Sequence, residues 1–126
     1  MTEVGSRQQV GVQGEDLAAA ELERQGMTVV ARNWRCRLGE IDIVALEPGS
    51  AGATTLVFCE VKCRTGLGFG APLESITYAK LRRLRQLTAQ FLADEQLSPA
   101  HIRLDAIGVV LIPGRVPELT HVRGIG

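Results

Sequence analysis

The stretches EIDIVAL, residues 40–46, and TTLVFCEVK, residues 54–62, decide the fold of this chain. Both are rich in β-branched and apolar residues, which are typical of strands. The segment PGSAG, residues 48–52, lies between them and has the glycines and proline of a turn. We therefore predict two neighbouring strands joined as a hairpin.

Charged side chains interrupt both of these apolar strands. Residues two apart share a face of an extended strand, so Glu60 and Lys62 project side by side, on the face of Leu56 and Phe58. Asp42 lies alone among apolar neighbours in the first strand. Since burying unpaired charges is costly, two converging carboxylates and a lysine predict a site for a divalent cation and an attacking water. The alternative is an ordinary ion pair on a solvated sheet face.

Magnesium or manganese is the expected ion, because hard cations prefer oxygen ligands and retain several waters. Asp42 and Glu60 fit the ligand role. Lys62 has three open roles: it orients the water, deprotonates it, or stabilises the pentavalent phosphate. The sequence alone does not choose among them.

The remaining elements follow from periodicity and from glycine and proline positions. Residues 1–12 are expected to form a loosely ordered leader. Helices are predicted at residues 13–25 and 77–95. A short strand is expected from Thr28, with a turn at Asn33–Trp34, and further strands are expected at 102–112 and 119–122. Residues 64–72 contain three glycines and should form a loop, in which residues 66–70 are a flap.

Composition indicates one folded domain spanning residues 1–126. The chain has 126 residues, 45% of them hydrophobic, and a formal net charge of zero. We expect no membrane association, because no apolar run approaches the length needed to span a bilayer. The polar start lacks a signal-peptide pattern, so a cytoplasmic location is expected.

The cysteines and histidines do not have the spacing of a zinc site. Cys36, Cys59 and Cys63 are expected to be buried free thiols, and Cys59 and Cys63 should face away from the charged pair. Trp34 has two interpretations, a core anchor or a base-stacking residue, of which the core anchor is favoured.

Twelve of the fourteen basic residues are arginines, which suit bidentate phosphate contacts. They concentrate at residues 32–37 and 80–85, where they form either a solvated surface or a contact to nucleic acid. We take Arg64, Lys80 and Arg83 as candidate nucleic-acid contacts. Lys80 lies at the edge of its helix's apolar stripe and is expected to reach towards the sheet, and Glu15 borders the apolar face of the first helix.

Four segments carry a family resemblance: GEIDIVA at residues 39–45, VFCEVKCR at 57–64, Lys80, and RLD at 103–105. In this order and spacing they resemble the YraN family of small bacterial proteins, UPF0102, from Gly14 to about Val110. That family in turn resembles the PD-(D/E)xK nucleases, and within them the archaeal Holliday-junction resolvases.

The resemblance implies that Glu15, Asp42, Glu60 and Lys62 fill the four active-site positions, with the three carboxylates as metal ligands. It implies an α/β fold with a restriction-endonuclease-like core, in which helices flank a central mixed sheet. The expected activity is metal-dependent hydrolysis of phosphodiester bonds in DNA, branched or single-stranded. The alternative is a nuclease-fold module that binds nucleic acid or a partner with little or no cleavage. Analogy with resolvases, which cut two strands symmetrically, favours a homodimer.

Overall fold

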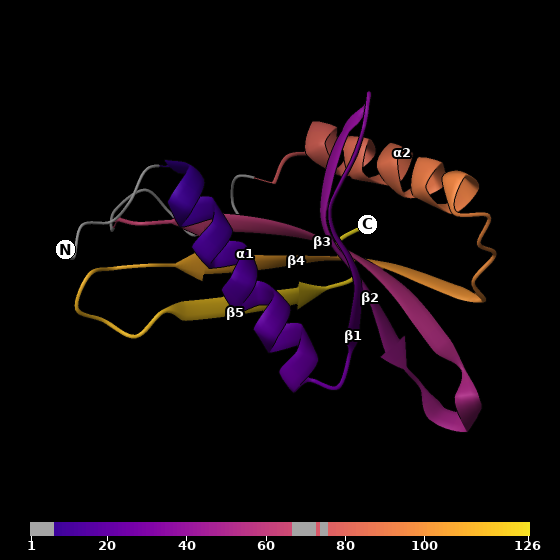
Figure 1. Ribbon diagram of the computed structural model, residues 1–126, viewed down its shortest axis with the longest axis horizontal. Coiled ribbons are helices and arrows are strands. Elements are labelled where there is room, and N and C mark those ends of the chain that lie inside the picture. Colours follow the sequence, from indigo (N-terminus) through magenta and orange to yellow (C-terminus); the bar gives the residue numbers. More distant parts are fainter. Residues whose placement is uncertain (1–6, 67–72, 74–75) are drawn as a thin grey trace.

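The computed structural model describes residues 7–66, 73 and 76–126 (Figure 1). These residues form an α/β fold with one mixed sheet and two α-helices, consistent with a restriction-endonuclease-like core. The elements follow in the order α1 (Arg7–Arg24), β1 (Thr28–Cys36), β2 (Gly39–Pro48), the short 3-10 helix η1 (Ser50–Gly52), β3 (Thr54–Arg64), α2 (Tyr78–Asp94), β4 (His101–Val110) and β5 (Glu118–Arg123).

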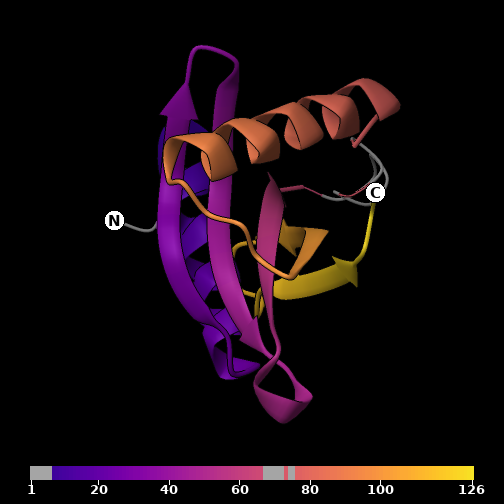
Figure 2. The same ribbon diagram turned by 90° about the vertical axis from the view of Figure 1, so that its right-hand side faces the viewer.

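The sheet order is β1-β2-β3-β4-β5, so every strand pairs with its neighbour in sequence. All pairs are antiparallel except β3 and β4, which run parallel. The chain between β3 and β4 passes through α2, as a parallel connection requires. The sheet is strongly twisted, with α1 on one face and α2 on the other (Figures 1 and 2).

The predicted hairpin of β2 and β3 is confirmed, with η1 in the turn. The predicted turn at Asn33–Trp34 is wrong, because β1 continues to Cys36 and pairs with β2 along its length. Asn33 has a positive φ of 53°, which asparagine tolerates better than most residues. The local backbone is therefore unusual, but the strand does not end there.

Both predicted helices are present, and the first begins earlier than expected. α1 starts at Arg7, so residues 7–12, assigned to a loose leader, are helical. It ends as predicted before Gly26, which has a positive φ of 95° and follows the last turn. Thr77 caps α2 by accepting a hydrogen bond from the backbone N–H of Lys80 at 3.2 Å.

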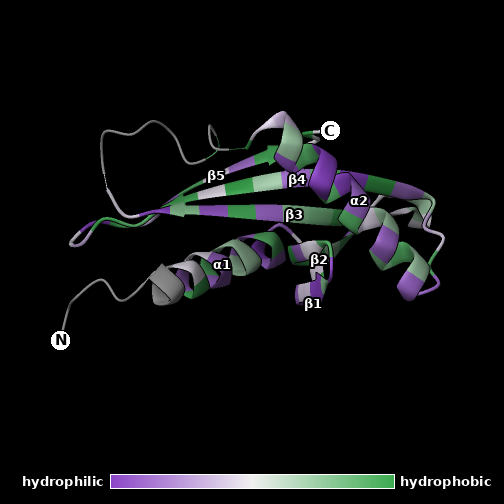
Figure 3. Cartoon of the chain, turned by 90° about the horizontal axis from the view of Figure 1, so that it is seen from above, coloured by the Kyte–Doolittle hydropathy of each residue, from purple (hydrophilic) through white to green (hydrophobic). Residues whose placement is uncertain are grey.

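Two apolar clusters, one on each face of the sheet, form the core. The cluster under α1 includes Ala18, Leu22, Ile43, Val57, Ile107 and Val109. The cluster under α2 includes Val44, Leu56, Phe58, Leu84, Leu87 and Phe91. Bands of hydrophilic and hydrophobic residues along β3 reflect this two-sided alternation (Figure 3). Trp34 stacks edge-on against Phe91 at 5.3 Å between ring centroids, so it is a core residue.

All three cysteines are free, but only Cys59 is buried, and Cys36 and Cys63 are half-buried. The predicted flap at residues 66–70 falls largely outside the described residues. In the part of the chain that is described, neither helix has the length and apolar character needed to cross a membrane.

Candidate active site

The site begins where β2 and β3 separate. Their last paired residues at this end are Ile43 and Cys59. One position further, an oxygen of Asp42, Oδ2, accepts a hydrogen bond from the backbone N–H of Val61 at 2.7 Å. The side chain thus takes the place of a strand-to-strand bond and fixes the Asp42 carboxylate beside Glu60.

Glu60 and Lys62 lie side by side on β3, as the alternation predicts. The Lys62 ammonium, Nζ, contacts Glu60 Oε1 at 2.9 Å, and both side chains are about three-quarters buried. Lys80, in the first turn of α2, lies close enough to Lys62 for the two ammonium groups to perturb each other. The predicted reach of Lys80 towards the sheet is confirmed.

Glu15 reaches the same site from α1 because the helix packs very closely on β3. A Cβ atom on Gly14 would lie only 2.8 Å from the sulfur of Cys63, so a larger residue there would push the helix away. The adjacent Glu15 is buried, at 8% exposure. The prediction that Glu15 borders the apolar face is therefore confirmed.

Two neighbouring residues of β1 hold the Glu15 carboxylate. Arg32 Nε and Asn33 Nδ2 donate to Glu15 Oε1 at 3.1 and 2.9 Å. Among the described residues, no hydrogen bond occupies Oε2. Donors of this kind orient a metal-ligating carboxylate without filling its ligand position.

Three carboxylates converge at this end of the sheet. Glu15, Glu40 and Asp42 each offer one oxygen, and the three oxygens lie within 4.8 Å of one another. Glu40 also accepts a hydrogen bond from Arg35 Nε at 2.5 Å. The geometry therefore places Glu40 in the acidic cluster.

This crowding perturbs Asp42 most. The pKa of Asp42 is raised to about 7. Burial is the largest cause, followed by the negative charge of Glu60, and Glu15 and Glu40 contribute less. The hydrogen bond from the Val61 N–H acts in the opposite direction. Within the described part of the chain, this carboxyl lies among three other carboxylates and forms no ion pair. A cation bound at this position would supply a positive partner.

The two lysines respond to the site in opposite directions. Burial lowers the pKa of Lys62, but the hydrogen bond and the charge of Glu60 outweigh it, so the net shift is upward. The charge of Lys62 lowers the pKa of Lys80. Lys62 is therefore protonated at neutral pH and is suited to electrostatic roles.

Arg64 and Arg83, the other candidate nucleic-acid contacts, form no ion pair with these carboxylates among the described residues. Arg64 is the last residue of β3, and its carbonyl accepts a hydrogen bond from the Leu111 N–H at 2.7 Å. Arg83 is exposed on α2, and its Nη1 donates to the carbonyl of Leu38 at 2.7 Å. Arg83 thus links α2 to the turn between β1 and β2.

Comparison with known proteins places the chain in a family. The model described as "Uncharacterised protein family UPF0102" matches residues 14–109, which span the whole site. The chain belongs to family UPF0102. It is 47% identical to a UPF0102 protein of Mycobacterium tuberculosis over 124 residues, covering 96% of this chain and 94% of that one. A UPF0102 protein of Nocardia farcinica is 42% identical over 125 residues, covering 99% and 94%.

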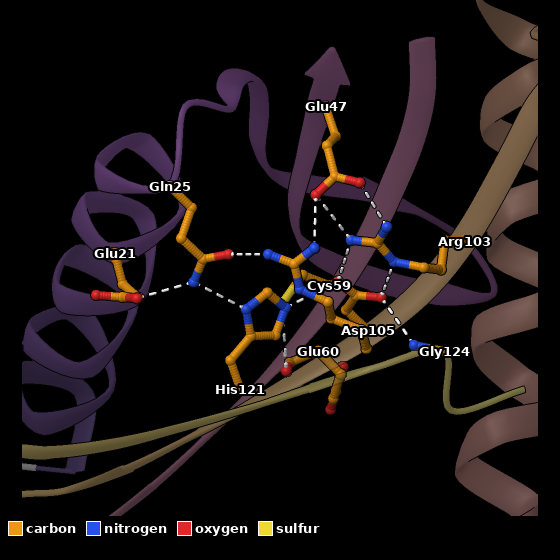
Figure 4. Close-up of polar contacts among 10 residues, drawn as sticks. Glu21, Gln25, Glu47, Cys59, Glu60, Arg103, Asp105, His121 and Gly124 are labelled. Atoms are coloured by element: carbon orange, nitrogen blue, oxygen red, sulfur yellow. Dashed lines mark hydrogen bonds and ion pairs between the residues drawn. The ribbon is translucent and has the colours of Figure 1, made fainter. Parts of the chain in front are cut away.

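This UPF0102 chain has a second polar centre under the C-terminal end of α1 (Figure 4). The carboxylate of Asp105 is fully buried and accepts hydrogen bonds from Arg103, at 2.8 and 2.9 Å, and from the Gly124 N–H at 3.1 Å. His121 Nε2 lies 2.8 Å from the same carboxylate. Arg103 is therefore the arginine partner of Asp105.

The network continues from Asp105 to α1. Arg103 Nη1 and Arg123 Nη1 donate to Glu47 at 2.6 and 3.0 Å, and Arg123 Nη2 donates to Gln25 Oε1 at 2.6 Å. Gln25 Nε2 donates to Glu21 at 2.8 Å. These bonds connect α1, β2, β4 and β5.

Sequence reasoning missed Arg32 and Asn33 as supports of the UPF0102 site. Asn33 was assigned to a turn because asparagine is common there. The same tolerance of positive φ lets it aim its amide at Glu15 from within a strand. The available signal was that Arg32 and Asn33 are polar residues on the strand that pairs with the acidic segment EID, residues 40–42.

Proposed function

We propose that this protein is a metal-dependent nuclease that hydrolyses phosphodiester bonds in DNA. The observation that carries the proposal is the convergence of Glu15, Glu40 and Asp42 within 4.8 Å, beside the ion-paired Glu60 and Lys62. Carboxylates from three elements at one sheet end, with a lysine next to them, supply the groups that phosphodiester hydrolysis needs.

The donor set fits magnesium or manganese, because all the available ligands are carboxylate oxygens. Glu15 and Asp42 would hold the ion, with Glu40 in the same cluster and Glu60 beside it as the further carboxylates. When bound, it would supply charge to offset that developing on the phosphate and would lower the pKa of a bound water. The raised pKa of Asp42 means that binding is coupled to loss of its proton.

The lysines have distinct roles in this proposal. Lys62, protonated and held by Glu60 at 2.9 Å, stabilises negative charge on the phosphate and does not act as the base. Lys80, exposed beside it, contacts the incoming phosphate. Arg32 and Asn33 keep the Glu15 carboxylate oriented.

A basic surface next to the site supports DNA as the substrate. The first turns of α2 carry Lys80, Arg82, Arg83 and Arg85, and the helix has no acidic residue before Asp94. The bond from Arg83 to Leu38 brings the β1–β2 turn, which carries Arg37, close to α2. Such a local surface attracts a polyanion although the whole chain is neutral.

The first test is Mn²⁺ binding by calorimetry. The parent protein is compared with an Asp42→Ala, Glu60→Ala double variant and with Glu23→Gln, which removes an exposed carboxylate of α1 away from the site. Binding should vanish in the double variant and persist in the control. A panel of linear, flapped and four-way DNA substrates with Mg²⁺ or Mn²⁺ then tests cleavage.

The outcomes separate the proposal from the binding-module alternative. Cleavage that depends on Asp42 and Glu60 supports the nuclease. DNA binding by the parent and by Asp42→Ala, with no cleavage of any substrate by the parent, supports the module. Neither metal nor DNA binding would rule out both.

A further inference from the structure

An apolar cavity of about 260 Å³ opens beside the N-terminal turn of α2. Its lining includes Ile76, Tyr78, Leu81, Ala106, Val122 and Ile125. Tyr78 stands at its rim with 72% of its surface exposed. The volume falls just below the range of about 300–1,000 Å³ that encloses a drug-sized ligand, so the cavity suits one planar group.

The strand register puts this cavity next to the candidate active site. Glu60 of β3 pairs with Ala106 of β4, and Ala106 pairs with Val122 of β5. These side chains share the face of the sheet that α2 covers. The cavity floor therefore begins one strand, about 4.8 Å, from the backbone that carries Glu60.

Two lysines lie near the carboxylates, and one of them is also near the cavity. Lys80 is two residues from Tyr78 in the first turn of α2, and its ammonium is close to Lys62. A ligand that spans both regions must combine a phosphate with an apolar, planar group. A nucleotide unit has this combination, since its base has an apolar π-face and its phosphate is anionic.

We propose that the cavity receives an unstacked nucleobase adjacent to the phosphate that is cut, which rests on the proposed function. The Tyr78 ring stacks on the base, and Leu81, Val122 and Ile125 enclose it. A base inside a duplex is stacked on both sides and does not enter without being extruded. The substrate class is therefore DNA with unpaired bases, such as single strands, flaps or open junctions.

Abasic scanning of a single-stranded oligonucleotide tests this in EDTA, where metal-dependent cleavage is prevented. Fluorescence anisotropy measures binding of the intact strand and of strands that lack one base each. We expect one abasic position to weaken binding by the parent about five- to hundredfold, the range for loss of one base stack.

Three variants act as matched comparisons. Val122→Trp fills the cavity from a partly exposed position and should bind intact and abasic strands equally. Tyr78→Ala should lose most of the discrimination, and Tyr78→Phe should retain it. Thermal unfolding checks that each variant is folded.

The results distinguish this inference from the proposed nuclease activity. Cavity-dependent base recognition without cleavage of any substrate supports base binding in the cavity, refutes the nuclease, and overturns the placement beside a cut phosphate. If the rate of cleavage changes neither with abasic sites in the DNA nor with Val122→Trp, the result supports the nuclease and overturns the inference. Equal binding of all strands by the parent, or no binding, also overturns it. Conversion of a dimer to a monomer by Val122→Trp would assign the cavity to a contact between copies and overturn it as well.

Discussion

Asp42 and Asp105 lie in the same sheet, but their surroundings shift the pKa of the two carboxyl groups in opposite directions. Asp42 accepts one backbone N–H and lies among three other carboxylates, and its pKa is raised to about 7. Burial alone would raise the pKa of Asp105 too, but hydrogen bonds from Arg103, His121 and the Gly124 N–H lower it below its ordinary value.

The difference separates a fully partnered centre from the one proposed to be catalytic. At Asp105 the protein supplies its own cations, so the carboxylate is fully partnered and connects four elements. At Asp42 the carboxylates exceed the cations that point at them, and the imbalance costs stability. A folded protein retains such strain mainly where function requires it.

The largest effect should come from breaking the partnered centre. Asp105→Ala leaves Arg103 without its main buried partner and should lower the free energy of unfolding by about 3–5 kcal/mol. Urea unfolding at pH 7 measures it. The ionised Asp105 stabilises the fold above about pH 4 and less so in acid, because its pKa is lowered, so the deficit should shrink as the pH falls. An equal loss for Asp42→Ala would contradict the comparison.

The next effect should come from removing the internal cation of the open site. Lys62→Met should slow DNA cleavage about 10²- to 10³-fold, the typical cost of losing one group that stabilises developing charge. Mn²⁺ binding should persist or tighten, because Glu60 no longer shares its charge with an ammonium. Single-turnover cleavage and calorimetry measure the two. Loss of Mn²⁺ binding with full folding would show that Lys62 organises the ligands.

A smaller effect, opposite in sign to that at Asp105, is expected from Asp42→Asn. Because its pKa is raised, Asp42 destabilises the folded state above about pH 7, where the folded protein must hold the ionised carboxylate in an unfavourable site. This cost disappears below about pH 4, where Asp42 is protonated in both the folded and the unfolded chain. Without metal, the variant should be more stable than the parent by about 1–3 kcal/mol at pH 8, and the gain should fade towards pH 4. Urea unfolding at several pH values checks this. A gain independent of pH would disprove the assignment.

The smallest effect concerns the support of Glu15. Asn33→Gly keeps the positive φ of 53° but removes the donor to Glu15, so it tests the hydrogen bond without backbone strain. Mn²⁺ affinity should fall about tenfold, at the low end for lost supports of a ligand, because Arg32 still donates to Glu15. Calorimetry measures the affinity, with Asn33→Ala as the strained comparison. Unchanged affinity for both variants would remove Asn33 from the site.

The sequence was sufficient for the hairpin and its charged face. Alternation put Glu60 and Lys62 on the side of Leu56 and Phe58, and the structure confirms it. The stripe of α2 and the stop at Gly26 were also predicted correctly. These features depend on local periodicity, which a sequence displays directly.

What the sequence did not predict depends on contacts between distant segments. The extent of β1 beyond Asn33 follows from its pairing with β2, which outweighs the local preference for a turn. The early start of α1 at Arg7 is an exception, because the sequence SRQQ at residues 6–9 has the Ser-x-x-Gln spacing of a capping box. The Asp105 network joins residues from α1, β2, β4 and β5, and no spacing rule links them.

The single parallel pair in the sheet has a consequence for how the protein is made. Glu15, Glu40, Asp42, Glu60 and Lys62 all precede α2, whereas β4, which closes the other side of β3, follows it. During synthesis the acidic groups therefore leave the ribosome while β3 is still the open edge of a three-stranded meander. Non-local parallel pairing is also slow to form. The complete sheet around the acidic groups should therefore form late, when β4 and β5 join it.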